Sequence, residues 1–259
     1  MQNLALIKLG GSVVTFKDKP LTANIEAIDG ISQALRGVKI PVIIVHGGGS
    51  FGHYWSVQYD IHTKPSRYDP HGVSVVHESM IALNQIIVNS MIRCGLNPYG
   101  LQPSTFSSAH RPVAAKTRKL FSMAKSNVVP VTFGDVVHVE GQNYSILSGD
   151  SLMTLIAKIL KPSRVVFATN VDGIYRDLDS RKLVPELGAR EGGKAIKIAM
   201  SPIADVTGGM QRKITEAFKI ASSGIDVMMV NGLHPERIVE AAQGKPTIGS
   251  LIKKQRGRS

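Results

Sequence analysis

The segment from Val45 to His53, with the sequence VHGGGSFGH, constrains the fold more than any other part of the chain. It follows the continuous apolar run IPVIIV, which is typical of a buried strand. Three consecutive glycines after such a strand let backbone N–H groups converge on an anion, since no Cβ blocks the approach. A helix that begins after Ser50 directs its positive end at the same point and places His53 about one turn inside. The segment therefore predicts an anion-binding loop; a tight turn beside a histidine that merely packs is the alternative.

The size and the single cysteine bound the class of protein. The chain has 259 residues, of which 43% are hydrophobic, and this length suits one large α/β domain or two closely joined lobes. Cys94 is the one cysteine, which excludes an intrachain disulfide and fits a reducing cytoplasm. No run approaches the roughly 20 apolar residues of a membrane span. We therefore expect a cytoplasmic protein with no membrane partner.

The formal net charge of +12 favours anionic partners. Nucleic acid and small phosphorylated molecules both fit this charge. Aromatic residues make up only 5% of the chain, and no RRM, KH or zinc-finger signature is present, so stacking platforms for bases are scarce. We expect a small phosphorylated substrate and no nucleic acid. The alternative from another class is a non-catalytic nucleotide-binding or nucleic-acid-binding protein.

Apolar runs of strand length alternate with amphipathic segments of helix length, which predicts an α/β fold with a mainly parallel sheet. The expected strands are Leu4–Leu9, Pro41–Val45, Val129–Thr132, Val165–Thr169 and Val227–Asn231, with a hairpin of Val136–Val139 and Tyr144–Leu147. The expected helices are Asn24–Leu35, Val73–Cys94, Gly149–Leu160, Gly209–Ser222 and Pro235–Ala242. The charged, glycine-containing segment 177–194 is expected to be a surface loop or a β-turn excursion. Pro162 is the best point of division, into lobes of residues 1–161 and 162–259 joined by one sheet.

A lysine accompanies the first glycine turn of the chain. Lys8 closes an apolar strand, Gly10 and Gly11 form the turn, Ser12 can cap or donate, and Lys17 follows within reach. A lysine that a strand end delivers into a glycine turn can lie along phosphate oxygens as a point charge. The turn is not a Walker A loop, because G-x-x-x-x-G-K-[ST] does not occur. A solvated lysine before a β-turn is the alternative.

Three further turns place charged or hydroxyl-bearing residues at helix starts or strand ends. They supply Gly149 and Asp150, Gly209 and Lys213, and Asp172 and Tyr175. The first pair opens a predicted helix, where Asp150 could hold nearby lysines in position by charge-assisted hydrogen bonds. The second opens another predicted helix, where Lys213 could reach a phosphate docked at the N-terminus. The third follows a strand at the carboxyl edge of the sheet, where α/β folds bind ligands. An ordinary helix cap and an ordinary turn are the alternatives.

Taken in this order, the motifs resemble the amino acid kinase superfamily from residue 4 to about residue 252. The matching segments are KLGGS at 8–12, HGGG at 46–49, TNVDGIY at 169–175 and TGGMQRK at 207–213. The resemblance implies a three-layer αβα sandwich with a mainly parallel open central sheet. The loop GSFGH at 49–53 is similar to that of archaeal-type isopentenyl phosphate kinases. A fosfomycin-like phosphonate kinase shares the histidine-bearing loop and is the nearest alternative.

The resemblance implies transfer of the ATP γ-phosphoryl group to isopentenyl phosphate, which gives isopentenyl diphosphate for isoprenoid biosynthesis. It implies five catalytic residues: Lys8, Lys17, His53, Asp150 and Lys213. The implied nucleotide contacts are Lys8, Gly10, Gly11, Ser12, Gly49, Asp172, Tyr175, Gly209 and Lys213. His53 would hold the acceptor phosphate, with backbone N–H groups from Gly48 and Gly149.

The remaining expectations concern the metal, the acceptor tail and assembly. Mg²⁺ is expected to be held mainly by the ATP phosphates, because no carboxylate cage is visible in the sequence. Val76, Met80 and Leu83 recur along one helix and are expected to line an apolar pocket for the prenyl chain, although such a stripe is more often ordinary core. Relatives commonly pair, so a homodimer is expected.

Overall fold

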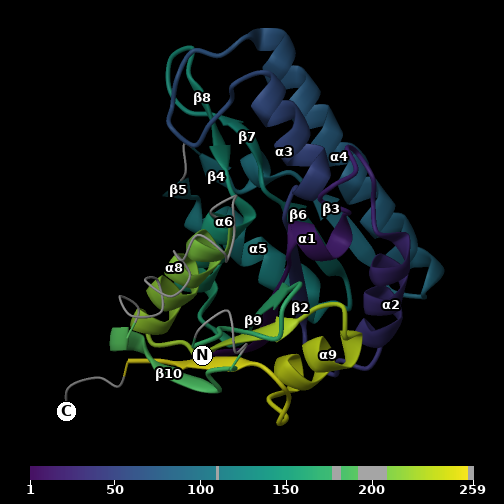
Figure 1. The fold of residues 1–259 in the computed structure, drawn as a ribbon, viewed down its shortest axis with the longest axis vertical. Coiled ribbons are helices and arrows are strands. Elements are labelled where there is room, and N and C mark those ends of the chain that lie inside the picture. The colour runs from purple at the N-terminus through teal and green to yellow at the C-terminus, as the bar shows by residue number, and fades with distance from the viewer. Residues whose placement is uncertain (109–110, 177–181, 192–208, 256–259) are drawn as a thin grey trace.

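The structure is a computed structural model, and it describes residues 1–108, 111–176, 182–191 and 209–255. Its centre is a single eight-stranded sheet in the order β10-β12-β11-β9-β1-β2-β6-β3 (Figure 1). All neighbouring strands pair in parallel except β11 and β12. The strands are β1 (Gln2–Leu9), β2 (Val42–His46), β3 (Pro98–Leu101), β6 (Val129–Phe133), β9 (Pro162–Thr169), β10 (Glu186–Gly188), β11 (Val227–Asn231) and β12 (Ser250–Lys253). The expectation of a mainly parallel open sheet is confirmed.

Helices cover both faces of this sheet. The helices are α1 (Gly11–Val14), α2 (Ile25–Leu35), α3 (Gly49–Gln58), α4 (Pro70–Arg93), α5 (Ala114–Lys125), α6 (Gly149–Leu160), α8 (Gly209–Ser222) and α9 (Pro235–Gln243). Alternate residues of β1 point to opposite faces: Leu4 and Leu6 join a core with α5, α6 and α8, whereas Ala5 and Ile7 join a second core with α2, α4 and α9. The three-layer αβα sandwich is therefore confirmed.

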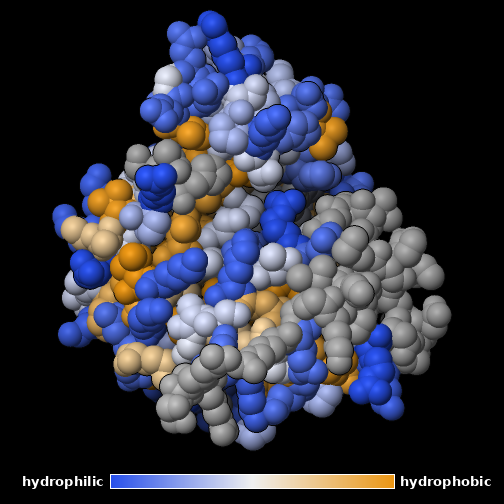
Figure 2. Space-filling model, turned by 90° about the vertical axis from the view of Figure 1, so that its left-hand side faces the viewer, coloured by the Kyte–Doolittle hydropathy of each residue, from blue (hydrophilic) through white to orange (hydrophobic). Residues whose placement is uncertain are grey.

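The expected hairpin forms outside the central sheet. Strands β7 (Asp135–His138) and β8 (Tyr144–Leu147) pair in antiparallel fashion. Val136 packs with Ile61 and Val76 in a third, smaller core against α3 and α4. The outer surface of this end of the molecule is largely hydrophilic (Figure 2). The opposite face of the hairpin is buried too, since Val137 and Leu147 belong to the core that contains Leu4 and Leu6.

Several element boundaries differ from the sequence expectation. Helix α4 begins at Pro70 and not at Val73, because the Asp69 side chain accepts hydrogen bonds from the N–H groups of His71 and Gly72 and so adds a capped turn. Helix α3 begins at Gly49. The minor elements are β4 (Ser107–Ser108), β5 (Arg111–Pro112) and short 3₁₀ turns at Pro103–Thr105 and Ala189–Glu191. Of the loop expected at 177–194, residues 177–181 and 192–194 lie outside the described residues, as do Thr207 and Gly208.

Among the helices described, none is both long enough and apolar enough to pass through a bilayer. The two halves of the chain contribute neighbouring strands, since β1 pairs with β2 on one side and with β9 on the other. The loops that follow these central strands consequently meet at one edge of the sheet.

Candidate functional site

A cavity of about 610 Å³ lies where the loops after β1 and β2 meet the starts of α6 and α8. Its lining comes from both halves of the chain. Of the residues singled out from the sequence, it brings together Lys8, Gly11, Ser12, Lys17, Gly48, Gly49, His53, Val76, Met80, Gly149, Asp150, Gly209 and Lys213. A parallel sheet commonly binds its ligand at this kind of edge, where connections leave toward opposite faces.

The first two glycine turns touch each other backbone to backbone. A Cβ on Gly11 would collide with the backbone nitrogen of Gly49. Gly49 has a φ of +49°, and a Cβ there would collide with the Thr15 side chain. The Thr15 hydroxyl accepts a hydrogen bond from the Ser50 N–H at 2.9 Å. The glycines are therefore required for the two loops to close around one space.

The cavity has a buried ion pair at its base. Lys8 Nζ lies 2.9 Å from Asp150 Oδ1, and both side chains are less than a tenth exposed. Ser148 caps α6 by accepting the Ser151 N–H, and this places Asp150 in the first helical turn. Burial alone would raise the pKa of the Asp150 carboxyl, but the charges of Lys8 and Lys213 hold that pKa below its ordinary value. Asp150 thus stays ionised and fixes the Lys8 ammonium at the cavity wall.

Further cations line the same cavity from two other segments. Arg212 and Lys213 lie about one turn into α8, and the Lys213 ammonium donates a hydrogen bond to the Gly209 carbonyl at 3.1 Å. Lys17 and Asp18 come from the exposed segment after α1. Arg212 was missed from the sequence, although its position next to Lys213 near the start of a helix was a usable signal.

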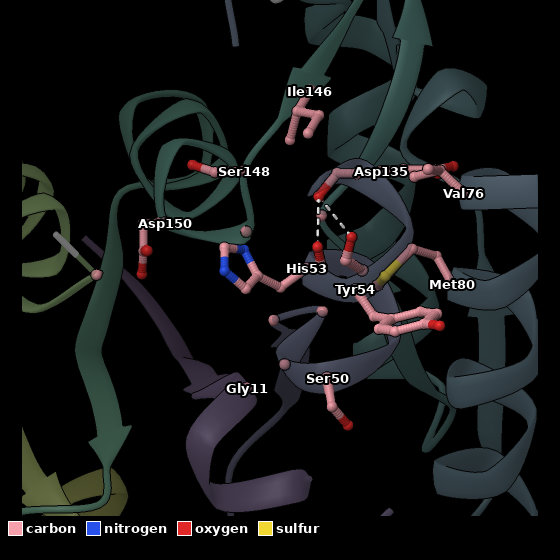
Figure 3. A pocket seen from close by; sticks show the side chains of 18 of the residues that line it. Gly11, Ser50, His53, Tyr54, Val76, Met80, Asp135, Ile146, Ser148 and Asp150 are labelled. Atoms are coloured by element: carbon pink, nitrogen blue, oxygen red, sulfur yellow. Dashed lines mark hydrogen bonds between the residues drawn. The ribbon is translucent and has the colours of Figure 1, made fainter. Parts of the chain in front are cut away.

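His53 projects from α3 and is exposed at the cavity. In Figure 3 its ring lies between Asp150 on one side and Ile146, Val76 and Met80 on the other. The site therefore has a cationic end and an apolar end, and His53 stands between them.

The apolar end is built by α4 and the β7–β8 hairpin. Val76 and Met80 line it from α4, and Val136 and Ile146 line it from the hairpin. The expected third member of the α4 stripe, Leu83, does not line the cavity: it is 0% exposed and belongs to the core between α4 and the sheet. The helical stripe turns away from the cavity toward the sheet at this position. Val136 and Ile146 were missed because their contact with α4 is long-range.

An ion pair ties the hairpin to α4. The Nδ1 atom of His77 lies 2.7 Å from Asp135 Oδ2, and Asp135 is buried at the first position of β7. The hydrogen bond to Asp135 raises the pKa of His77 above its ordinary value, whereas burial raises the pKa of Asp135. The pair holds the inner side of the hairpin against the helix that forms the opposite wall.

His46 shapes the glycine loop from behind. It is fully buried at the end of β2, where its Nε2 accepts a hydrogen bond from the Asn84 amide at 3.1 Å. Its Nδ1 therefore carries the proton and donates to the Gly47 carbonyl at 3.1 Å. Burial lowers the pKa of His46 to about 4, so the ring is neutral near pH 7. This fixed tautomer orients the first peptide of the glycine run.

Gly10, Asp172 and Tyr175 lie outside the cavity lining. The Asp172 carboxylate accepts a hydrogen bond from Arg237 Nη1 at 2.6 Å and another from Asn231 Nδ2 at 3.2 Å. The hydrogen bond from Asn231, together with Arg237, holds the pKa of Asp172 below its ordinary value. The Ser12 hydroxyl, which lines the cavity, donates to Asn170 Oδ1 at 3.1 Å and so connects the cavity with the 169–175 segment. In the part of the chain that the structure describes, no group of three or more His, Cys, Asp or Glu could hold a metal ion.

The chain resembles known proteins over nearly its whole length. Residues 3–231 match the amino acid kinase family. The chain is 34% identical over 251 residues to the isopentenyl phosphate kinase of Thermoplasma acidophilum, and the alignment covers 96% of this chain and 100% of that protein. It is 30% identical over 266 residues to the isopentenyl phosphate kinase of Methanothermobacter thermautotrophicus, with 96% and 98% covered. A crystal structure of an isopentenyl phosphate kinase substrate complex superposes with a TM-score of 0.79 at 32% identity, covering 97% of this chain and 100% of that one.

Proposed function

Because the chain belongs to the amino acid kinase family, we propose that it transfers the γ-phosphoryl group of ATP to isopentenyl phosphate. The products are isopentenyl diphosphate and ADP, which makes the chain an enzyme of isoprenoid biosynthesis. The observation that carries the proposal is the position of His53 between a cationic end and an apolar end of one cavity. An acceptor with a phosphate head and a short hydrocarbon tail matches this division.

The chemistry requires little from a general base. The acceptor phosphate is already an oxyanion near neutral pH, so catalysis comes from positioning and from stabilising the charge that spreads over the transferring group. Lys8, Lys17 and Lys213 supply positive charge in this proposal. Asp150 orients Lys8 through the ion pair at 2.9 Å.

The acceptor contacts follow from the two ends of the cavity. His53 donates a hydrogen bond to the acceptor phosphate, and the backbone N–H groups of Gly48 and Gly149 do the same. The hydrocarbon tail packs on the apolar walls from α4 and the hairpin, where the transfer of apolar surface out of water stabilises binding.

The nucleotide binds on the side of the site opposite the acceptor. The residues proposed to contact it are Lys8, Gly10, Gly11, Ser12, Gly49, Asp172, Tyr175, Gly209 and Lys213. Mg²⁺ would be held mainly by the ATP phosphate oxygens and would neutralise part of their charge. In this arrangement residues 1–161 carry the acceptor site and contribute contacts to the ATP phosphates, whereas residues 162–259 carry the rest of the nucleotide site.

Assembly and compartment are further parts of the proposal. We infer a homodimer that forms at the edge of the sheet, where β3 is the last strand and α4 beside it exposes Ile81 and Ile92. Light scattering after gel filtration tests this inference, and a monomeric mass at micromolar concentration contradicts it. The single cysteine of the chain supports the cytoplasm as its compartment.

A coupled assay of ADP release tests the reaction. The purified chain is incubated with Mg·ATP and either isopentenyl phosphate or fosfomycin, and ³¹P NMR identifies the product. We expect turnover with isopentenyl phosphate and the pair of doublets of an asymmetric diphosphate ester. Turnover only with fosfomycin assigns the chain to the phosphonate kinases. Salt-sensitive binding to RNA or DNA without ATP turnover overturns the enzymatic proposal altogether.

A further inference from the structure

A buried hydrogen bond joins the two helices whose N-terminal ends bring charge to the site. The Thr154 hydroxyl of α6 donates to Glu216 Oε2 of α8 at 2.6 Å, and both residues are less than a tenth exposed. The other carboxylate oxygen of Glu216 lies 2.7 Å from Lys219 Nζ. Helices α6 and α8 lie side by side on one face of the sheet (Figure 1). The bond therefore sits inside the contact between the two helices.

The bond lies one turn below the charged groups on each helix. Thr154 follows Asp150 by four residues on α6, and Glu216 follows Lys213 by three on α8, so each pair shares a helix face. Asp150 and Lys213 both line the cavity, and the charge of Lys213 lowers the pKa of Asp150. Any slide or rotation of α8 against α6 would change the position of Lys213 relative to Asp150.

Apolar packing alone is a weak determinant of the register of α8 on α6. The two helices also share an apolar core, to which α6 contributes Met153 and Ile156 and α8 contributes Ile214 and Ala217, and the burial of apolar surface has no directional preference. A carboxylate in such a contact costs desolvation free energy, so its presence is not explained by packing. Buried polar groups of this kind are best attested as devices that set register.

We propose that Thr154 and Glu216 are positioning residues that set the register of α8 on α6 and thereby place Lys213 for phosphoryl transfer. The role in transfer rests on the proposed function. Neither residue lines the cavity, so the bond acts through the helix that carries Lys213.

Variants of Thr154 test the proposal through kinetics. Thr154→Val keeps the shape and removes the donor, and we expect kcat to fall about ten- to hundredfold with little change in KM for either substrate. Thr154→Ser restores the hydroxyl and is expected to recover most of the rate. Ser90→Ala is the matched control, because Ser90 on α4 also donates to a carboxylate on a neighbouring helix, Asp29 at 2.5 Å, away from the cavity; its kcat is expected to stay at the wild-type value.

A double-mutant cycle separates positioning from general structural damage. Lys213→Ala removes a donor to the transferring group, which costs about 10²- to 10³-fold in kcat. If Thr154 acts through Lys213, Thr154→Val causes no further loss in the Lys213→Ala background. A full additional loss in that background overturns the proposal, as does an unchanged kcat in Thr154→Val alone.

A crystal structure of Thr154→Val gives a readout that does not depend on the acceptor. We expect the first turn of α8 to shift relative to Asp150; an unshifted Lys213 overturns the proposal. If the wild-type chain does not turn over isopentenyl phosphate, the proposed function fails while this structural measurement still decides whether the bond sets the register.

Discussion

His46 and His53 flank the same glycine run but occupy opposite environments. His46 is fully buried, neutral and held by two hydrogen bonds, whereas His53 is exposed at the cavity. A buried imidazole with a fixed tautomer suits a structural task, and an exposed one is free to meet a ligand. The two residues should therefore respond differently to mutation.

His53→Ala should weaken the use of the acceptor and spare the nucleotide. Loss of a hydrogen bond to a charged group costs about 1.5–3 kcal/mol, which corresponds to about a ten- to hundredfold fall in kcat/KM for isopentenyl phosphate. Steady-state kinetics with each substrate varied in turn measure this split. His53→Gln, which keeps an N–H donor, should recover part of the loss. A parallel collapse of ATP affinity in His53→Ala would show that the assigned role is wrong.

His46 should make the folded state sensitive to acid. Its pKa is about 4 in the folded chain against an ordinary value of 6.5, so the unfolded chain binds the extra proton first as the pH falls. The contribution of neutral His46 to the free energy of unfolding is therefore fully present above pH 6.5. It declines by about 3 kcal/mol as the pH falls toward 4. Urea unfolding from pH 4 to pH 7 measures the slope. His46→Gln keeps a donor and an acceptor, and its slope should be shallower; an equal slope contradicts the assignment.

At the scale of elements, the cavity depends on the β7–β8 hairpin as much as on the glycine loops. The hairpin supplies Val136 and Ile146, and the ion pair of His77 with Asp135 holds it against α4. The opposite wall is the face of α4 that carries Val76 and Met80. Because two elements form these walls, the length of the tail pocket is set by their side chains.

Val136→Ala and Leu83→Ala should therefore have different effects. Val136 lines the cavity, so its truncation deepens the pocket and should raise the activity toward longer prenyl phosphates relative to isopentenyl phosphate. Leu83 is fully buried in the core, so its truncation should cost about 2–5 kcal/mol in stability and leave the acceptor profile unchanged. An acceptor series with increasing chain length, assayed beside urea unfolding, compares the two variants. A broadened profile in Leu83→Ala alone would reverse this interpretation of the walls.

Elements with strong local signals were predictable from the sequence. The central strands read as continuous apolar runs because they are buried on both faces, and the glycine turns after them marked the site. Helix α5 was missed because AAKTRKLFSMAK carries many charges, and the short strands β3, β10 and β12 have too few residues for a clear period. The hairpin was predicted, but its place above α3 and α4 depends on long-range packing. Leu83 belonged to the right stripe, yet the point at which the stripe leaves the cavity could not be read from spacing.

At the scale of the whole molecule, both halves of the chain share one sheet and one cavity. The central strand β1 pairs with β2 from its own half and with β9 from the other half. The core around Leu4 and Leu6 also includes side chains of α5 and α6 from the first half and of α8 from the second. Separation of the halves would expose this core and break the parallel ladder, so neither half retains its apolar contacts alone.

The chain should consequently unfold in one cooperative transition. Trp55, the single tryptophan, lies in α3 and reports on the first half, whereas far-UV circular dichroism reports on all helices and strands. In urea the two signals should give the same midpoint and the same slope, because strands from both halves must leave the sheet together. ATP should raise both midpoints equally, since a ligand of the folded state stabilises the entire cooperative unit. Distinct midpoints, or a nucleotide shift seen by circular dichroism alone, would mean that residues 1–161 and 162–259 unfold as independent lobes despite the shared sheet.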